Sequence, residues 1–224
     1  MLKNESKNTE KTSASSAEKI KIAVLVSGGG TNLQALLDAE EAGRIPDGKI
    51  CLVLSDRADA YALQRAEKAR VKTFCVDRTR MLNGAERERE MRRILEDNGA
   101  ELIILAGFLS LLSKEFTSAY EGRIINVHPS LIPAFCGKGF YGLKVHEAAL
   151  AYGVKITGAT VHYVNEIPDG GKIILQKAVR IKQSDTPQSL QRRVMREAEW
   201  KILPAAAQKV CAKLKKEKQK GCRA

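Results

Sequence analysis

The chain has 224 residues, of which 44% are hydrophobic and 29% charged, and this composition is typical of a globular protein with one domain or at most two small ones. No apolar run approaches the roughly 18 residues that a membrane-spanning helix needs, and the polar first residues lack the apolar segment of a secretory signal. The five cysteines show no CxxC spacing, so we expect a reduced protein of the cytoplasm.

The formal net charge of +12 is concentrated near the C-terminus, where residues 209–224 contribute +6. Residues 1–19 contribute +1, and the rest of the chain contributes +5. The segment KLKKEKQK is typical of a solvated helix end, with nonspecific polyanion binding as the alternative. We therefore expect small anionic substrates as partners, and neither a specific nucleic acid nor a membrane.

Short apolar runs alternate with helical patterns over the first 127 residues. The apolar runs predict strands at residues 21–26, 49–55, 71–76, 101–107 and 123–127. The patterns between them predict helices at residues 33–43, 56–69, 86–97 and 111–122. This alternation predicts an α/β fold with a doubly wound, mostly parallel, Rossmann-like sheet.

The pattern changes after residue 155. Residues 157–164 alternate like a strand, the segment NEIPDGG forms a turn, and residues 172–181 return as the partner strand. A closing helix is predicted at about residues 186–203. We thus expect one domain with a C-terminal antiparallel hairpin, flanked by two tails, with the divisions at residues 1–19 (disordered tail), 20–205 (domain) and 206–224 (basic tail).

The segment IINVHPSLIPAF places polar side chains at the end of a buried strand. Asn126 and His128 are two residues apart, so both point to the same face. Pro129 and Pro133 prevent a helix and favour a stiff, open loop. Because ligands of doubly wound folds gather at the carboxyl ends of the strands, we expect these two side chains to belong to a functional site.

A glycine-rich stretch, Ser27 to Asn32, connects the first predicted strand to the first helix. Backbone N–H groups can approach an anion here, and the helix N-terminus favours it electrostatically. A plain strand-to-helix turn is the structural alternative. A dinucleotide site fits less well, because Leu33 stands where the third glycine of that fingerprint belongs and Arg57 follows the first acidic residue, Asp56. A single phosphate is the better match.

The chain has three histidines, His128, His146 and His162, and their wide spacing makes a metal site a poor interpretation. Singly, each could be an ordinary core or surface residue. His128 differs because it follows a parallel strand, and Asp169 could reach it if the hairpin packs alongside. No nucleophile elbow is present, and Cys136 has no neighbouring base, so covalent catalysis has little support.

Five segments together resemble the glycinamide ribonucleotide formyltransferases of purine synthesis: SGGGTNLQAL, LAGFLSLL, INVHPSLIPAF, KVHEAAL and TGATVHYVNEIPDGGKIILQ. The resemblance extends from about residue 20 to residue 205. Asn-x-His-Pro-Ser alone marks the wider group that uses 10-formyltetrahydrofolate, which includes methionyl-tRNA formyltransferase and formyltetrahydrofolate deformylase. The SGGGTN loop singles out the ribonucleotide enzymes, and we expect none of the additional domains of the other two within these 224 residues.

The resemblance implies roles for individual residues. It implies a catalytic set of Asn126, His128 and Asp169. It implies ribonucleotide binding by Gly30, Thr31, Asn32 and Glu199, although a solvated helix carboxylate is an equally good reading of Glu199. It implies folate binding, largely through backbone groups, by Leu109, Ser110, Leu111, Leu112, Asn126, Asn165, Glu166, Ile167, Pro168 and Asp169.

Two departures from the family pattern stand out. Many members have Met-Arg after AGF, whereas this chain has Leu109 and Ser110. The loop between Pro133 and His146 is also long and glycine-rich, with Phe140 and Tyr141 as candidate folate contacts.

The implied reaction is one-carbon transfer from 10-formyltetrahydrofolate, as co-substrate, to the amine of glycinamide ribonucleotide, by a monomer or homodimer and without a metal or covalent intermediate. The enzyme must juxtapose two substrates, stabilise a tetrahedral oxyanion and move protons. For these roles we expect the pKa of His128 to be raised and that of Asp169 to be lowered. The alternatives are a deformylase, in which water replaces the amine, and a non-catalytic nucleotide-binding module.

Overall fold

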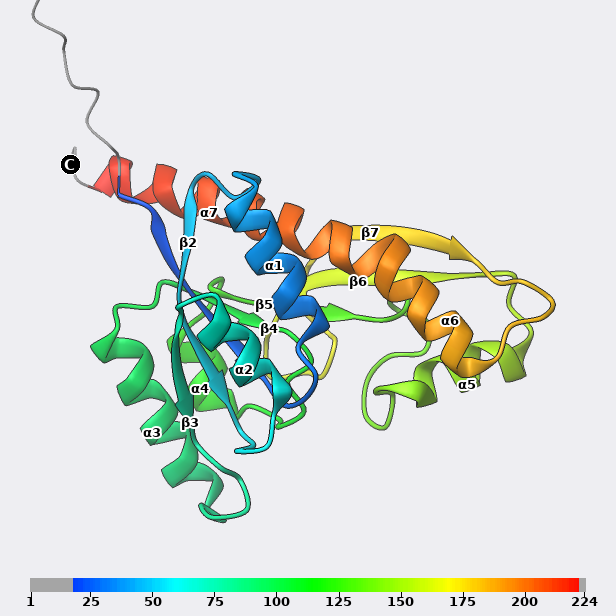
Figure 1. The fold of residues 1–224 in the computed structure, drawn as a ribbon, viewed down its shortest axis with the longest axis horizontal. Coiled ribbons are helices and arrows are strands. Elements are labelled where there is room, and N and C mark those ends of the chain that lie inside the picture. The colour runs from blue at the N-terminus through cyan, green and yellow to red at the C-terminus, as the bar shows by residue number, and fades with distance from the viewer. Residues whose placement is uncertain (1–17, 222–224) are drawn as a thin grey trace, which may run out of the picture.

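The computed structural model describes residues 18–221, so the predicted N-terminal tail lies almost entirely outside the described residues. One seven-stranded sheet organises the chain, in the order β3-β2-β1-β4-β5-β6-β7 (Figure 1). Its first five strands are mutually parallel, whereas β6 pairs antiparallel with both β5 and β7. The strands are β1 (Ile20–Val26), β2 (Gly48–Ser55), β3 (Lys72–Cys75), β4 (Leu102–Leu105), β5 (Ile124–His128), β6 (Ile156–Tyr163) and β7 (Ile173–Arg180).

This sheet confirms the predicted fold class and the C-terminal hairpin. Seven α-helices and one π-helical turn connect and cover the described strands, and no helix within residues 18–221 is long and apolar enough to cross a membrane. The helices are α1 (Thr31–Glu41), α2 (Tyr61–Lys68), α3 (Gly84–Asp97), α4 (Lys114–Ala119), α5 (Leu143–Tyr152), α6 (Pro187–Val194), the π-helical turn η1 (Met195–Glu199) and α7 (Trp200–Gly221). The sequence did not predict α5.

Alternation along the buried strands produces two hydrophobic cores, one on each face of the sheet. In β1, Ile22 and Val24 pack under α1, α2, α6 and α7, while Ala23 and Leu25 face α3 and α4. Side chains two residues apart share a face, so a fully apolar strand can serve both cores. The carboxyl ends of β1 to β5 are therefore held on a rigid frame.

The C-terminal helix is longer than the sequence predicted, and the expected tail is wrong for residues 206–215, which form a packed part of this helix, whereas residues 216–220 are an exposed helix end as expected. Helix α7 continues to Gly221 and packs across the sheet, beside the start of β1 in Figure 1. Val210 and Cys211 are fully buried. Lys215 pairs with Asp47 at 2.7 Å, so part of the basic segment serves tertiary structure.

Helix α7 packs against the sheet because an apolar stripe runs through its lysine-rich sequence. Leu203, Ala206, Ala207, Val210, Cys211 and Leu214 recur at intervals of three and four residues, and all pack into the core on the α1 side of the sheet. This spacing is a helical signal that the charge of the segment obscures.

Candidate active site

Asn126 and His128 lie at the carboxyl end of β5 with their side chains on one face, as the sequence predicted. The antiparallel register sets Asn126 opposite His162 and His128 opposite Thr160, and directly opposed residues share a face. The amide Nδ2 of Asn126 lies 3.3 Å from Nε2 of His162. The sequence alone assigns His162 no role, because the register of two distant strands cannot be read from either one alone.

Asp169 reaches this face from the turn between β6 and β7. One carboxylate oxygen, Oδ2, lies 3.4 Å from Nδ1 of His128, and the other, Oδ1, lies 3.5 Å from Nε2 of His162. Asp169 has a φ of 56°, an uncommon conformation for a residue other than glycine. Two histidines of adjacent strands and one turn carboxylate thus form a compact group, hereafter the His-Asp-His cluster.

The loop after β5 is attached to this cluster at several points. Nε2 of His128 donates to the carbonyl oxygen of Phe135 at 2.9 Å, and the backbone N–H of Gly137 donates to Oδ2 of Asp169 at 2.9 Å. Thr160 donates to the carbonyl oxygen of Ser130 at 2.7 Å. Contacts with β6 and the cluster, in addition to the two prolines, therefore position the loop.

The pKa values of the cluster follow from burial and charge together. His128 is only 4% exposed, and burial lowers its pKa below the ordinary value, although Asp169 acts in the opposite direction. The expectation of a raised pKa for His128 was therefore wrong: the cost of burying the cation exceeds the attraction of one nearby carboxylate. For Asp169, burial raises the pKa, but the His162 hydrogen bond, the charge of His128 and the N–H of Gly137 outweigh it, so the pKa is lowered as expected.

The two ring nitrogens of His162 have different partners. Its Nδ1 lies 2.7 Å from the carbonyl oxygen of Tyr163 and donates to it. Its Nε2 faces both Nδ2 of Asn126 at 3.3 Å and Oδ1 of Asp169 at 3.5 Å, so an unprotonated Nε2 accepts from Asn126 and a protonated one donates to Asp169. This leaves the second amide hydrogen of Asn126 free to bind a ligand oxygen. His162 thereby determines the orientation of the Asn126 amide.

The glycine loop lies at the carboxyl end of β1 and leads into α1. Gly30 is the N-cap of α1, with a φ of 71° and no side chain to satisfy the first-turn N–H groups. A Cβ at Gly30 would lie 2.6 Å from Cβ of Ala62, so helix α2 packs directly against the loop. Gly30 is required by its backbone conformation and by this packing, whatever the ligand.

Glu199 is buried, which rules out the solvated alternative. It ends the π-helical turn η1 and is 4% exposed. Nδ2 of Asn32 donates to its Oε2 at 2.6 Å, joining two of the predicted ribonucleotide-binding residues. Burial raises the pKa of Glu199 to about 7, with the Asn32 hydrogen bond only partly opposing it. π-helical turns inside helices are frequent at functional sites, and this one lies beside the N-terminus of α1.

The two predicted folate-binding segments lie close together. Residues 109–112 follow β4, and residues 165–169 follow β6. Lys114, just after the first segment, forms an ion pair with Glu166 of the second, with 3.1 Å between Nζ and Oε2. The two segments expose apolar side chains, with Leu109 50%, Leu111 76% and Ile167 60% exposed. An aromatic ligand could cover such a surface.

Ser110 has a partner that sequence reasoning missed. Its Oγ donates to Oδ2 of the fully buried Asp56 at 2.5 Å, and Arg78 approaches the same oxygen at 3.7 Å. Asp56, Arg78 and Ser110 follow β2, β3 and β4, so this group forms at the same edge of the sheet. A guanidinium is thus present near position 110 despite the missing arginine.

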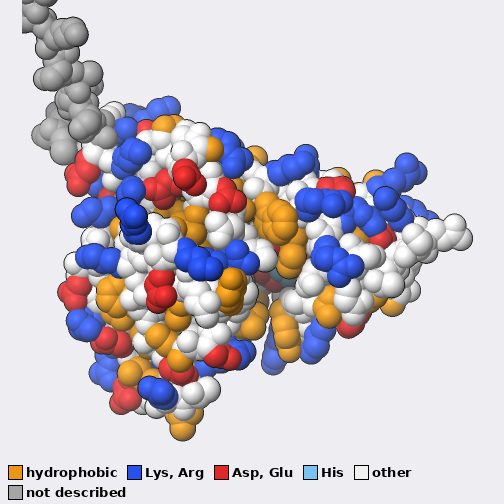
Figure 2. All heavy atoms as spheres, viewed as in Figure 1, with side chains coloured by type: hydrophobic (Ala, Val, Ile, Leu, Met, Phe, Trp, Pro, Cys, Tyr) orange, Lys and Arg blue, Asp and Glu red, His pale blue; other side chains and the backbone are white. Residues whose placement is uncertain are grey.

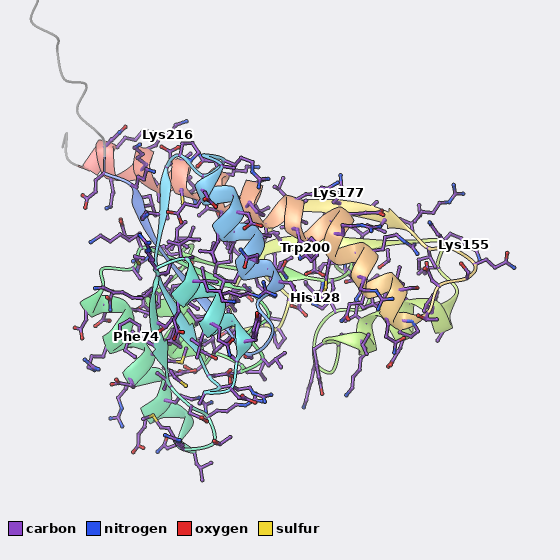
Figure 3. The ribbon with its side chains drawn as sticks, in the orientation of Figure 1. Phe74, His128, Lys155, Lys177, Trp200 and Lys216 are labelled. Carbon is purple, nitrogen blue, oxygen red and sulfur yellow. The ribbon has the colours of Figure 1, made fainter. Side chains whose placement is uncertain are left out.

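These features lie on one side of the molecule, where the β6–β7 hairpin, α5 and α6 project from the main body. Figure 2 shows a hollow between this projection and the body, with histidine visible in it, and Figure 3 labels His128 at the same place. The structure therefore brings the catalytic residues implied by the resemblance to a recess at the carboxyl edge of the sheet.

Comparison with known proteins agrees with this arrangement. The family model described as "Formyl transferase" matches residues 20–207. A phosphoribosylglycinamide formyltransferase of Haemophilus influenzae is 41% identical over 184 residues, which are 82% of this chain and 84% of that protein. A glycinamide ribonucleotide transformylase of Symbiobacterium toebii has a similar structure, with a TM-score of 0.81 and 41% identity over 87% of this chain and 88% of that one. The chain therefore belongs to the formyl transferase family.

Larger proteins contain the same unit. The "Trifunctional purine biosynthetic protein adenosine-3" of Gallus gallus is 42% identical over 194 residues, and this chain spans 19% of its length.

Proposed function

We propose that this formyltransferase transfers the formyl group of 10-formyltetrahydrofolate to the amine of glycinamide ribonucleotide, in the cytoplasm and as a step of purine synthesis. The single observation that carries the proposal is the meeting of Asn126, His128 and Asp169 at the end of β5, in a chain that also has the glycine loop at the end of β1. Relatives that match most of this chain along most of their own length bear the name of this transferase.

Each side chain suits one part of the reaction. The free hydrogen of the Asn126 amide is a donor for the oxyanion that forms when the amine attacks the formyl carbon. His128 is neutral before reaction, because burial lowers its pKa, so it can accept a proton as charge develops. Asp169, kept ionised by its lowered pKa, stabilises the histidine cation that results.

The binding residues suit the two substrates. Gly30, Thr31 and Asn32 present the first-turn N–H groups of α1 to the ribonucleotide phosphate. Glu199 lies within hydrogen-bonding distance of Asn32, and burial raises its pKa to about 7, so both its protonated and its ionised form are accessible to donate or accept a hydrogen bond with the sugar. The exposed apolar side chains of residues 109–112 and 165–169 would cover the folate, whose polar edge the backbone of these segments would bind.

The test is the dependence of folate turnover on the amine. The protein is incubated with 10-formyltetrahydrofolate in the presence and absence of glycinamide ribonucleotide, and tetrahydrofolate is measured. The proposal predicts turnover only with the ribonucleotide. Equal turnover without the amine would identify a deformylase, and no turnover in either mixture would contradict formyl transfer to this acceptor.

A further inference from the structure

Arg65 is held beside the glycine loop by three contacts. Its Nε donates to the carbonyl oxygen of Gly29 at 2.8 Å, and its Nη1 donates to Oε1 of Gln34 at 3.1 Å. Its guanidinium lies 5.0 Å from the centre of the Tyr61 ring. These contacts fix the plane of the guanidinium, so little side-chain entropy remains to be lost when a ligand binds.

Helix α2, which carries Arg65, is packed directly on the loop. The backbone N–H of Ala62 donates to the carbonyl oxygen of Gly28 at 3.0 Å, and a Cβ at Gly30 would collide with Ala62. Arg65 is one helical turn beyond Ala62 and therefore lies on the same side of the helix. Its position relative to the loop is set by backbone packing rather than by a flexible side chain.

A pocket of about 290 Å³ adjoins both Arg65 and the start of α1. Its lining residues come from α1, α2, α7 and the loop after α1, and they are Thr31, Gln34, Ala35, Asp38, Arg44, Arg65 and Trp200. Figure 3 labels Trp200 at the start of α7, and Figure 2 shows Lys and Arg side chains between α1 and α2 in the same view.

The pocket has unused capacity to bind an anion. Within residues 18–221, neither Arg44 nor Arg65 forms an ion pair, and Oδ1 of Asp38, the acidic residue of the pocket, accepts from Gln34 at 2.8 Å. The indole Nε1 of Trp200 is buried without a hydrogen-bond partner among the described residues. α1 has no acidic residue in its first turn to neutralise its N-terminus.

We propose that Arg65 is a specificity-determining residue that binds the substrate phosphate from the pocket side of the glycine loop, while the first-turn N–H groups of α1 bind it from the other. This inference rests on the proposed function, because it takes a phosphorylated amine as the substrate. A phosphate dianion needs several donors, and the planar guanidinium fork provides charge-assisted ones in a geometry that an ammonium group does not match. Arg65 would thus distinguish the ribonucleotide from the unphosphorylated riboside.

The first test is Arg65→Gln, with Lys68→Gln as the matched control. Lys68 is exposed on the same helix, so both variants lose one positive charge from α2. We expect Arg65→Gln to raise the KM for the ribonucleotide by about tenfold to a hundredfold, with an unchanged KM for the formyl donor and an unchanged Tm. Lys68→Gln should match wild type, and Arg65→Lys should recover only part of the loss. Equal ribonucleotide KM values in wild type and Arg65→Gln would overturn the proposal.

The second test separates a phosphate contact from support of the loop. The variants are assayed with glycinamide ribonucleotide and with the corresponding riboside, which lacks the phosphate. We expect the Arg65→Gln loss with the ribonucleotide only. An equal loss with both acceptors would mean that Arg65 merely supports Gly29, and the proposal would be wrong.

Binding of inorganic phosphate, measured by calorimetry without any formyl donor, makes the result independent of catalysis. Weaker phosphate binding by Arg65→Gln than by Lys68→Gln supports the inference even if the acceptor of the reaction differs from the one proposed. Unchanged phosphate binding in Arg65→Gln overturns it even if formyl transfer is confirmed.

Discussion

Nδ1 of His128 faces Oδ2 of Asp169 across 3.4 Å, while Nε2 of the same ring donates to the carbonyl oxygen of Phe135. A doubly protonated His128 would satisfy both acceptors, yet burial favours the neutral ring. His128 is thus neutral before the reaction, and Asp169 and the carbonyl oxygen of Phe135 stabilise the cation once it forms. In our account this pair accepts the proton released by the attacking amine.

The first prediction follows from this coupling. His128→Ala and Asp169→Asn should each lower kcat by roughly a hundredfold or more, because general acid–base catalysis contributes on that scale. The double variant should be much less than multiplicatively worse, since the two side chains act as a unit. Steady-state kinetics with unchanged circular dichroism spectra checks this. If the two losses in kcat multiply in the double variant, or if Asp169→Asn keeps nearly the wild-type kcat, Asp169 is only a turn residue.

The second prediction concerns His162, whose Nε2 faces both Asn126 and Asp169. His162→Leu removes the acceptor that orients the Asn126 amide, so kcat should fall by about tenfold to a hundredfold, as misplaced reacting groups do. The His162 hydrogen bond lowers the pKa of Asp169, so its loss raises that pKa. The acid limb of the kcat profile should therefore move to higher pH. An unchanged profile would show that His162 serves packing alone.

The third prediction concerns Glu199, whose pKa burial raises from 4.5 to about 7. The native state binds the proton of Glu199 more tightly than the unfolded chain does. The resulting contribution to the free energy of unfolding is therefore fully present below pH 4.5 and is lost as the pH rises through 7. The loss amounts to about 3 kcal/mol.

Glu199→Gln retains the Asn32 contact but has no proton to lose. Its unfolding free energy relative to wild type should increase by about that amount between pH 4.5 and pH 8. Urea unfolding at both pH values measures the difference. A difference independent of pH would mean that Glu199 is ionised in the folded protein throughout this range.

The fourth prediction concerns α7. Deleting residues 209–224 removes the buried Val210 and Cys211 and the Lys215–Asp47 pair. Since burying an apolar side chain contributes about 1.5–3 kcal/mol, the truncation should lose about 3 kcal/mol or more of unfolding free energy. Deleting only residues 216–224 is the matched control, with an expected loss below about 1 kcal/mol, because Lys218–Glu101 is a surface pair. Equal Tm values for both truncations would contradict the packing of α7.

Much of this architecture could be predicted from the sequence, because apolar runs alternate with helical patterns and indicate a parallel sheet without any tertiary information. The two-residue period of a strand placed Asn126 and His128 on one face. Asp169 could be named from the sequence only as an acid that would reach His128 if the hairpin packed alongside, since a turn acid has no periodicity that links it to a strand residue far away in the chain. Its place in the catalytic set came from the family resemblance.

What could not be predicted depends on register and burial. His162 enters the site only because β6 pairs with β5 in one register. Asp56 and Ser110 meet because their strands end at the same edge of the sheet. The lysines of α7 concealed its buried stripe, and the sign of the His128 pKa depends on a burial cost that no local pattern reveals.

The most direct measurement is a single-turnover experiment with the donor labelled with carbon-13 in its formyl group, followed by NMR for wild type and Asn126→Ala. The account predicts that wild type moves the label to the amine of glycinamide ribonucleotide, and that Asn126→Ala binds both substrates but transfers the label roughly a hundredfold to a thousandfold more slowly, as expected for loss of an oxyanion donor. Release of the label as formate at the same rate with and without the amine, or a wild-type transfer rate in Asn126→Ala, would contradict it.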